Sequence, residues 1–519
     1  MAYSTKYPVG EQSFSSLIEG GFLYVDKTQY IEKIVNGSKY YFLGRPRRFG
    51  KSLFLSTLKF FFEGRRDLFK GLYADTIPWD WEPYPVLHIS LNMWSYTEPG
   101  MLEKAFNSHL QDWEAKYSIP NTGDDISGRF RKVIKRAYET TGRQVVILVD
   151  EYDNPLVDNL DNRELYEHYR SRLSAVYSNF KSSADYIRLV FLTGVSRFGK
   201  ISVFSGLNNI LDISFDKEFA DICGITEEEV DKYFTQGIAT LAEDEEMTTE
   251  KTRAELKLNY DGYQFSRRKS DIYNPFSLLC AMRRREISNY WIQSGRTEFV
   301  SKRIAASNVN VEALLNTQCS QETLLGIEPF SPNPTALLYQ TGYLTIKKFN
   351  KESGLYTLGL PNLEVKRGLI DNLLPLYTSI EEHQTAVEIS RFVEELRNGD
   401  ADGFMKRLQR LFAGYSYEMR LENENNFHNV IYMLILLLGV FVETERKTSD
   451  GRIDLLITTS KYRYLIELKV DNTPEEALRQ IDDKEYALSF ADDSREVIKI
   501  GANFSTETRR LTGWKVEKG

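Results

Sequence analysis

The sequence predicts a multidomain α/β protein. A parallel β-sheet with helices on both faces comes first, then a mainly helical segment with one β-hairpin, then a second α/β domain. The first half alternates short apolar runs rich in Val, Ile, Leu and Phe with longer amphipathic stretches, which is the pattern of strands covered by helices. The length of 519 residues also exceeds what one hydrophobic core serves, so roughly two to four domains are expected.

The strands of the first sheet are expected at residues 40–44, 86–91, 145–149, 188–193 and near 211–215. This pattern defines a first domain at residues 1–235. The acidic run 243–246 interrupts it and opens a lid at residues 236–362, where two β-rich runs flanking the turn 350–354 predict a winged-helix-like hairpin. A helical linker at residues 363–414 and an α/β domain at residues 415–519 complete the prediction.

Composition and charge restrict the function. The longest uncharged apolar run, residues 430–442, is 13 residues, short of the roughly 20 that cross a bilayer, so no membrane association is expected. The first residues lack a signal peptide, and three scattered cysteines (Cys223, Cys280 and Cys319) suit a reducing compartment, so we expect a cytoplasmic protein. A net charge of −8 argues against a general nucleic-acid coat, so any DNA contact must be local.

A phosphate-binding loop follows the first predicted strand. The run Arg45-Pro46-Arg47-Arg48-Phe49-Gly50-Lys51-Ser52 lies between that strand and a helical stretch. ATP needs backbone N–H groups at a helix N-terminus, a lysine on its β and γ phosphates and a hydroxyl on Mg²⁺, and Gly50, Lys51 and Ser52 supply them. Arg45 stands where G-x-x-x-x-G-K-[ST] has its first glycine, and the plainer alternative is a basic turn before a buried helix. The motif predicts a P-loop NTPase fold.

Two further strand ends carry polar groups that suit this chemistry. Residues 145–149 lead into Asp150, which could hold the Mg²⁺ shell, and Glu151, which could polarise the attacking water. The strand at 188–193 ends in Thr193, where a polar group could sense the γ phosphate, and Arg197 could stabilise the charge that develops during transfer. The alternative for Arg197 is an ion pair with a surface acid.

The last domain contains a second group of charged residues on apolar strands. Asp454 precedes Glu467 by 13 residues, so a tight turn would place the two strands side by side. Glu467 and Lys469 are two residues apart and therefore project from one face. Carboxylates that hold a divalent ion, together with a cation, are what phosphodiester hydrolysis needs. The alternative is an edge strand with outward-facing charges.

The first half resembles the bacterial AAA-ATPase-like family. The motifs that carry the resemblance are Tyr24-Val25-Asp26-Lys27-Thr28, the loop 45–52, Val149-Asp150-Glu151-Tyr152-Asp153 and Thr193-Gly194-Val195-Ser196-Arg197-Phe198. The resemblance implies ATP binding by Arg47, Arg48, Gly50, Lys51 and Ser52, with Asp150 and Glu151 serving Mg²⁺ and water. Arg45 in place of glycine leaves the rate of hydrolysis open.

The C-terminal cluster resembles the PD-(D/E)xK nuclease superfamily, and thus a restriction-endonuclease-like domain, over about residues 415–500. The proline of that motif is absent, with Ile453 before Asp454. The resemblance implies a late active-site contact from Gln480. The further positions that match it are Glu424, Glu445, Lys484 and Tyr486. His428 lies four residues after Glu424 but is not assigned to the site, because a lone histidine is more often structural than a ligand.

Two functions are therefore expected as alternatives. The first is an ATP-regulated nuclease that cuts DNA with Mg²⁺ or Mn²⁺, in defence or DNA processing. The second is a nucleotide-switched signalling or binding protein whose nuclease-like domain is non-catalytic, which Arg45 and the acidic net charge favour. The sequence leaves the oligomeric state open, a homo-oligomer included.

Overall fold

The computed structural model describes residues 4–120, 123–197, 209–267, 270–292, 297–307, 309–326, 330–378, 380, 382–413, 424–439, 443–449, 452–483, 494–505, 507–508 and 510–518. The chain forms two compact units. The first comprises Met1–Gly295 with Asn316–Glu364, and the second comprises Arg296–Leu315 with Val365–Gly519.

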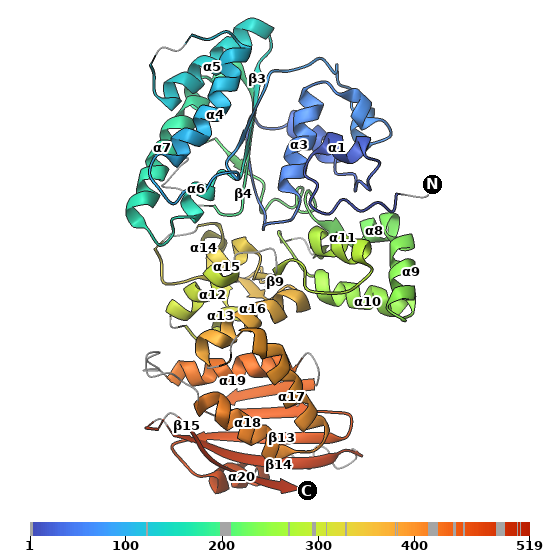
Figure 1. Cartoon of the computed structure of the whole chain (residues 1–519), viewed down its shortest axis with the longest axis vertical. Helices are drawn as coiled ribbons and strands as arrows, with labels where there is room; N and C mark the ends of the chain where they lie inside the picture. The colour runs from blue at the N-terminus through green and yellow to red at the C-terminus, as the bar shows by residue number, and fades with distance from the viewer. Residues whose placement is uncertain are drawn as a thin grey trace. The chain divides into compact units, whose positions relative to one another are not determined.

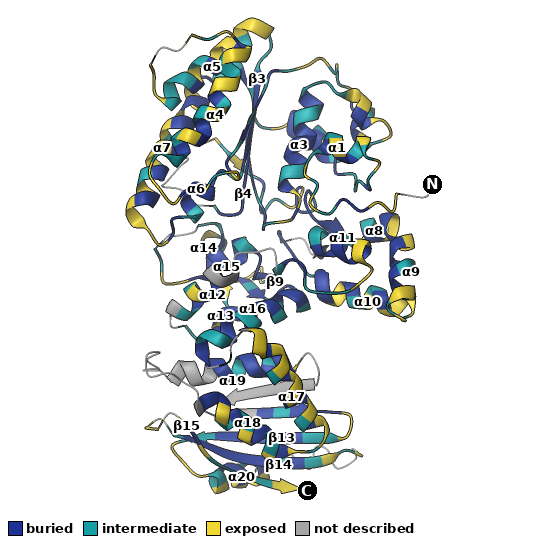
Figure 2. Ribbon diagram, viewed as in Figure 1, coloured by how far each residue is buried: buried dark blue, intermediate teal, exposed yellow. Residues whose placement is uncertain are grey.

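A five-stranded parallel sheet forms the centre of the first unit, with the order β2-β3-β4-β1-β5. Its strands are β1 (Tyr40–Gly44), β2 (Val86–Ser90), β3 (Val145–Asp150), β4 (Ile187–Gly194) and β5 (Leu211–Asp212). All six residues of β3 are buried, as expected for an interior strand that is covered on both faces (Figure 2). The predicted parallel sheet is confirmed.

Helices cover both faces of this sheet (Figure 1). On one side lie α1 (Phe14–Glu19) and α3 (Lys51–Phe62), and on the other lie α4 (Met101–Lys116), α5 (Ile126–Thr141) and α7 (Arg163–Ser182). Shorter elements connect them: α2 (Gln29–Val35), η1 (Arg66–Phe69), η2 (Tyr73–Thr76), α6 (Asn154–Val157) and η3 (Ala184–Tyr186). Because every strand runs in the same direction, the loops at their carboxyl ends lie along one edge of the sheet.

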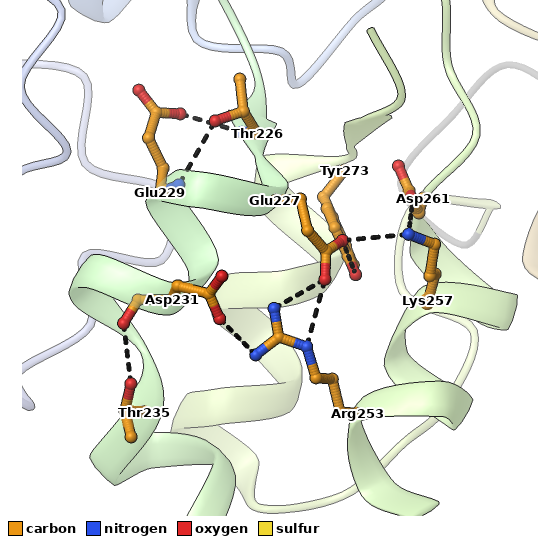
Figure 3. A network of polar contacts seen from close by, with 9 residues as sticks. All are labelled: Thr226, Glu227, Glu229, Asp231, Thr235, Arg253, Lys257, Asp261 and Tyr273. Atoms are coloured by element: carbon orange, nitrogen blue, oxygen red, sulfur yellow. Dashed lines mark hydrogen bonds and ion pairs between the residues drawn. The ribbon is translucent and has the colours of Figure 1, made fainter. Parts of the chain in front are cut away.

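A helical subregion of the first unit follows the sheet. It contains β6 (Ile225–Thr226), α8 (Glu227–Tyr233), α9 (Thr235–Asp244), α10 (Thr249–Tyr260), β7 (Ile272–Tyr273) and α11 (Pro275–Arg284). Figure 3 shows a polar network that joins these elements. The Glu227 carboxylate accepts hydrogen bonds from Arg253, Lys257 and the Tyr273 hydroxyl, at 2.6, 3.2 and 2.8 Å. The network ties the first turn of α8 to α10 and β7.

A helix followed by a β-hairpin completes the first unit. Helix α15 (Thr335–Thr341) precedes β9 (Thr345–Phe349) and β10 (Tyr356–Gly359), which pair as a hairpin. Strand β10 also pairs with β8 (Gln318–Cys319), and α14 (Gln321–Leu325) lies between β8 and α15 in the sequence. The hairpin turn covers the residues where the sequence predicts it.

The second unit has a mixed sheet with the order β11-β12-β13-β14-β15. Its strands are β11 (Glu443–Ser449), β12 (Arg452–Thr458), β13 (Tyr462–Val470), β14 (Glu496–Ser505) and β15 (Arg510–Lys518). Its helices are α12 (Thr297–Ala306), α13 (Val311–Leu315), α16 (Leu363–Tyr377), η5 (Glu382–Gln384), α17 (Thr385–Arg397), α18 (Ala401–Ala413), α19 (Glu424–Leu438) and α20 (Pro474–Asp483). Helices α17 and α18 lie on one face of the sheet and α20 on the other (Figure 1).

The expected order of helix, strand, strand, helix for the last hundred residues is incomplete. The structure has three strands between α19 and α20 and two more after α20. Strand β11 has the sequence Glu-Thr-Glu-Arg-Lys-Thr-Ser, which lacks the apolar alternation that identifies a strand. It forms by pairing with β12 along its whole length. Within the described part of the chain, no helix is both long enough and apolar enough to cross a membrane.

Candidate functional sites

The phosphate loop joins the carboxyl end of β1 to the first turn of α3, as predicted. Gly50 is the N-cap of α3 with φ +96°, and Lys51 is 4% exposed at the first helical position. The Lys51 amine donates hydrogen bonds to the carbonyl oxygens of Arg45 and Pro46, at 3.0 and 3.1 Å. Ser52 is half-buried beside it. The lysine is therefore held within the loop, at the helix N-terminus where an anion is stabilised.

The two arginines inside the loop lie differently from each other. Arg47 is half-buried, and its carbonyl accepts a hydrogen bond from the Trp291 indole at 3.0 Å. Arg48 is exposed, has a left-handed backbone with φ +66°, and places its guanidinium 4.8 Å from the centre of the Phe276 ring. The exposed arginine is accessible to an approaching phosphate.

Arg45 is part of the protein interior and faces away from the inside of the loop. Its side chain is 1% exposed, and its guanidinium donates to four carbonyl oxygens, those of Gly44, Ser214, Phe219 and Ala220, at 2.8, 2.8, 3.0 and 3.3 Å. It also stacks over the Phe265 ring at 4.3 Å. Burial lowers the pKa of the guanidinium. The residue that departs from the motif thus anchors the loop to the segment after β5.

Asp150 and Glu151 lie at the carboxyl end of β3. Strand β4 lies between β3 and β1, the strand that leads into the phosphate loop. Asp150 is 3% exposed and accepts a hydrogen bond from the Thr193 hydroxyl at 2.6 Å. Thr193 in turn is the register partner of Leu43 on β1. Glu151 has a left-handed backbone with φ +51° and accepts from the Asn154 amide at 2.9 Å. Strain of this kind on a non-glycine residue is typical of functional positions.

Asp153 has no role in the sequence-based prediction, yet it organises the end of β4. It is 1% exposed and accepts backbone N–H bonds from Val195 and Ser196, at 3.1 and 2.6 Å. Burial raises the pKa of Asp153 to about 6. The hydrogen bond from the Ser196 N–H lowers this pKa, and the charge of nearby Glu151 raises it. The sequence signal is the aspartate three residues after Asp150, although spacing alone does not show that its partners lie on β4.

Arg197 follows β4 and forms an ion pair, which is the simpler of its two predicted roles. Its guanidinium lies 2.5 Å from the Asp212 carboxylate on β5, and its backbone N–H donates to the Gln340 side chain on α15 at 2.6 Å. These residues and Arg45 line the same small pocket. The structure therefore connects the end of β4 both to the edge strand and to the helix that precedes the hairpin.

The C-terminal cluster is centred on β13. Asp454 on β12 is the register partner of Glu467, so the predicted strand pairing is observed. The Asp454 side chain lies outside the described part of the structure. Glu467 is 1% exposed, and the Lys469 amine lies 3.4 Å from its Oε1 atom. The bland alternative of outward-facing charges on an edge strand is wrong, because β13 is central and both side chains are largely buried.

Gln480 joins this cluster from α20. The Lys469 amine donates a hydrogen bond to the Gln480 side-chain carbonyl. Leu465, two residues before Glu467, packs against Leu478 and Ile481 of α20, so the helix covers the face that carries Glu467 and Lys469. Three of the four predicted residues are thus brought together by β13 and α20.

Two buried polar atoms of this cluster lack hydrogen-bond partners among the described residues, Glu467 Oε1 and Gln480 Nε2. No group of three or more metal-ligating side chains is found within the described residues. The side chains of Glu424, His428 and Glu445, and residues Lys484 and Tyr486, fall outside the described part. The donor set that is described fits a divalent ion, because the buried Glu467 carboxylate lies beside the register position of Asp454, and its Oε1 atom accepts no hydrogen bond from the described residues although the Lys469 amine lies 3.4 Å away.

The fold and the two clusters define a class of protein: a P-loop ATPase-like module joined to a nuclease-like module. Comparison with known families supports both parts of this description. Residues 8–204 match the model of the predicted AAA-ATPase family, and residues 422–514 match the PD-(D/E)XK nuclease superfamily. The first match contains the phosphate loop, Asp150 and Arg197, and the second contains the register pair Asp454 and Glu467.

A curated relative extends this similarity to the whole chain. An uncharacterized protein in the vnfD 5' region of Azotobacter chroococcum mcd 1 is 34% identical over 523 residues, covering 99% of this chain and 99% of the relative. The chain belongs to the family of AAA-ATPase-like proteins that carry a C-terminal PD-(D/E)XK nuclease-superfamily domain. The segment between the two matched domains is therefore shared with that relative.

Proposed function

We propose that the protein binds and hydrolyses ATP and that its C-terminal domain cleaves DNA with Mg²⁺ or Mn²⁺, under the control of the bound nucleotide, in defence or in DNA processing. The observation that carries the proposal is the convergence of Glu467, Lys469 and Gln480 on one covered face of β13, where the buried Glu467 Oε1 atom is ion-paired with Lys469 and accepts no hydrogen bond from the described residues. Burying charged groups in this way is costly unless they are paired or coordinate a metal ion.

Each residue of the nuclease-like cluster has a distinct task in this proposal. Glu467 and Asp454 hold the divalent ion, which supplies a polarised phosphate and an activated water when bound. Lys469 stabilises the charge that develops on the scissile phosphate and positions the water. Gln480 orients the lysine amine through its carbonyl oxygen, and its amide N–H remains available to the substrate.

The nucleotide site has a matching division of tasks. Lys51 and the N–H groups of the loop bind the phosphates of ATP, with Arg47 and Arg48 as further cationic contacts. Ser52 and Asp150 hold Mg²⁺, and Glu151 orients the attacking water. Thr193 is hydrogen-bonded to Asp150 and sets the position of that carboxylate, and Arg197 would have to leave Asp212 in order to reach the γ phosphate.

The test is cleavage of DNA by the purified full-length protein with Mg²⁺ or Mn²⁺, with and without ATP. Glu467→Gln and Lys469→Met should abolish cleavage and retain ATP binding, because the nucleotide site lies in the other unit. Lys499→Met is the matched control, since Lys499 lies on the adjacent strand β14 and pairs with Asp482 at 2.5 Å. Calorimetry with Mn²⁺ gives a readout independent of turnover, and Glu467→Gln should weaken binding of the ion.

Cleavage that persists in both variants would refute the assignment. Binding of Mn²⁺ and DNA by the parent protein without cleavage under any nucleotide condition would favour the alternative, a nucleotide-switched binding protein with a non-catalytic nuclease-like domain.

A further inference from the structure

One of the three chain connections between the units begins at a buried carboxylate. The chain passes between the units after Gly295, after Leu315 and after Glu364. Trp291 lies four residues before the first connection, and Glu364 is the last residue before the third. Both residues belong to the first unit and are buried, with 3% and 0% exposure.

Glu364 joins the start of α16 to the backbone of residues 290–291. Its Oε1 atom accepts the backbone N–H groups of Tyr290 and Trp291, at 2.5 and 2.7 Å. Its Oε2 atom accepts the Ser277 hydroxyl at 2.7 Å. Glu364 lies in the first turn of α16, a helix that continues into the second unit. The start of α16 is therefore tied to the backbone of residues 290–291.

Trp291 connects the same point to the phosphate loop. Its indole N–H donates to the Arg47 carbonyl at 3.0 Å, and its ring packs against Tyr343 with 5.3 Å between ring centres. Gly342 has φ +92°, and a Cβ atom there would lie 2.8 Å from Pro46 and 3.4 Å from the Trp291 ring. The turn between α15 and β9 thus packs tightly on both the loop and the tryptophan.

The choice of a carboxylate here is informative. No cation lies within ion-pairing distance of Glu364 among the described residues, so its burial costs several kcal/mol that an apolar side chain would avoid. Unlike an apolar side chain, the carboxylate accepts three hydrogen bonds and so fixes two neighbouring backbone N–H groups relative to α16.

We propose that Glu364 and Trp291 form a relay that couples occupancy of the phosphate loop to the start of α16, the helix that continues into the second unit. Phosphates bind the backbone N–H groups of the loop and so fix the peptide that carries the Arg47 carbonyl. The bound loop favours the arrangement in which Trp291 is hydrogen-bonded and Glu364 holds α16. Loosening the relay therefore weakens the response of α16 to nucleotide, and because such coupling is reciprocal it also lowers the affinity for nucleotide by the coupling factor. The relay rests on the proposed ATP binding.

Hydrogen exchange of the full-length protein tests the relay without requiring cleavage. In the parent, Mg²⁺ and a non-hydrolysable ATP analogue should slow exchange in α16. Trp291→Phe removes the indole donor, and Glu364→Leu removes the two oxygens that accept the three hydrogen bonds. Both variants should bind the analogue by calorimetry and lose the nucleotide-induced protection of α16.

Two variants serve as controls. Trp79→Phe makes the same change where the indole N–H has no hydrogen bond to any described residue, and Glu227→Gln alters another carboxylate with several donors (Figure 3). Both should keep the response. If the two relay variants bind nucleotide and still respond, or if they fail to bind it, the relay is refuted. If the parent itself binds no nucleotide, the proposed ATP function fails, and the relay fails with it.

Discussion

Restoring the missing glycine of the phosphate loop should damage the protein. Arg45→Gly converts the loop to the common motif, which a sequence comparison alone would rate as an improvement. In the structure, however, the Arg45 guanidinium donates to four carbonyl oxygens of the interior. Removing it takes a donor from each of these carbonyls, of which Phe219 keeps the Ile222 N–H at 3.3 Å, and opens a cavity beside Phe265.

The expected magnitude follows from these contacts. Four hydrogen bonds at about 1 kcal/mol net each, plus the added flexibility of glycine in the unfolded chain, favour the parent. Relief of the cost of burying a cation favours the variant and offsets part of this. We expect a net loss of about 3 to 5 kcal/mol in the free energy of unfolding, from the lost hydrogen bonds and the cavity less the desolvation that is relieved.

Calorimetric thermal unfolding measures this loss. The transition of the first unit should fall by about 5 to 10 °C in Arg45→Gly. Arg48→Gly is the matched control, because Arg48 is exposed and has a left-handed backbone that glycine adopts without strain. That variant should unfold within about 1 kcal/mol of the parent or above it. If Arg45→Gly is as stable as the parent and binds ATP at least as tightly, the anchoring role of Arg45 is wrong.

Three further outcomes are expected. Lys51→Ala should abolish ATP binding in calorimetry with Mg²⁺, and unchanged affinity would remove the basis for the nucleotide site. Glu151→Gln should bind ATP and stall, because a water-orienting acid acts mainly in the transition state; hydrolysis at the parent rate would transfer the role to Asp153 or another group. Burial raises the pKa of Glu364 from its usual 4.5 to about 7, so the folded protein keeps its proton to a higher pH than the unfolded chain does. The free energy of unfolding should therefore fall by about 3 kcal/mol as the pH rises from 4.5 to 7. In denaturant unfolding, Glu364→Gln should lack this part of the pH dependence, and equal pH profiles would show that the carboxyl does not titrate there.

The strands of the central sheet could be predicted from the sequence because they are buried on both faces and therefore appear as continuous apolar runs. Strand β1 has the predicted bounds, and β2, β3 and β4 differ from prediction by one or two residues. Strand β5 is shorter than expected, with residues 211–212 in place of 211–215. The Asp212 side chain accepts the Ser214 N–H at 2.9 Å and turns the chain there. A local polar contact of this kind competes with strand pairing.

The candidate sites were predictable where a motif assigns a residue one local task. Lys51 and Asp150 lie where strand and helix order place them, and Glu467 with Lys469 follows from the period of two in a strand. The partners that come from distant segments were not predictable. Nothing near Arg45 in sequence indicates the carbonyls of residues 214–220, and nothing near Trp291 indicates Glu364, because these contacts depend on how the elements pack.

The electrostatics of the phosphate loop explain why an arginine there is compatible with nucleotide binding. Arg45 and Lys51 are both nearly fully buried, and among the described residues their amino and guanidinium groups bond only carbonyl oxygens, with no carboxylate within ion-pairing distance. Carbonyl dipoles offset part of the cost of burying a cation but do not neutralise its charge. Two such cations beside the N-terminus of α3 therefore leave a positive potential at the loop, to which a triphosphate is the complementary ligand. The arginine adds to this potential from behind the loop, while the left-handed conformations that need little side-chain bulk fall at Arg48 and Gly50. A phosphate loop can thus lose its first glycine and retain both its shape and its charge.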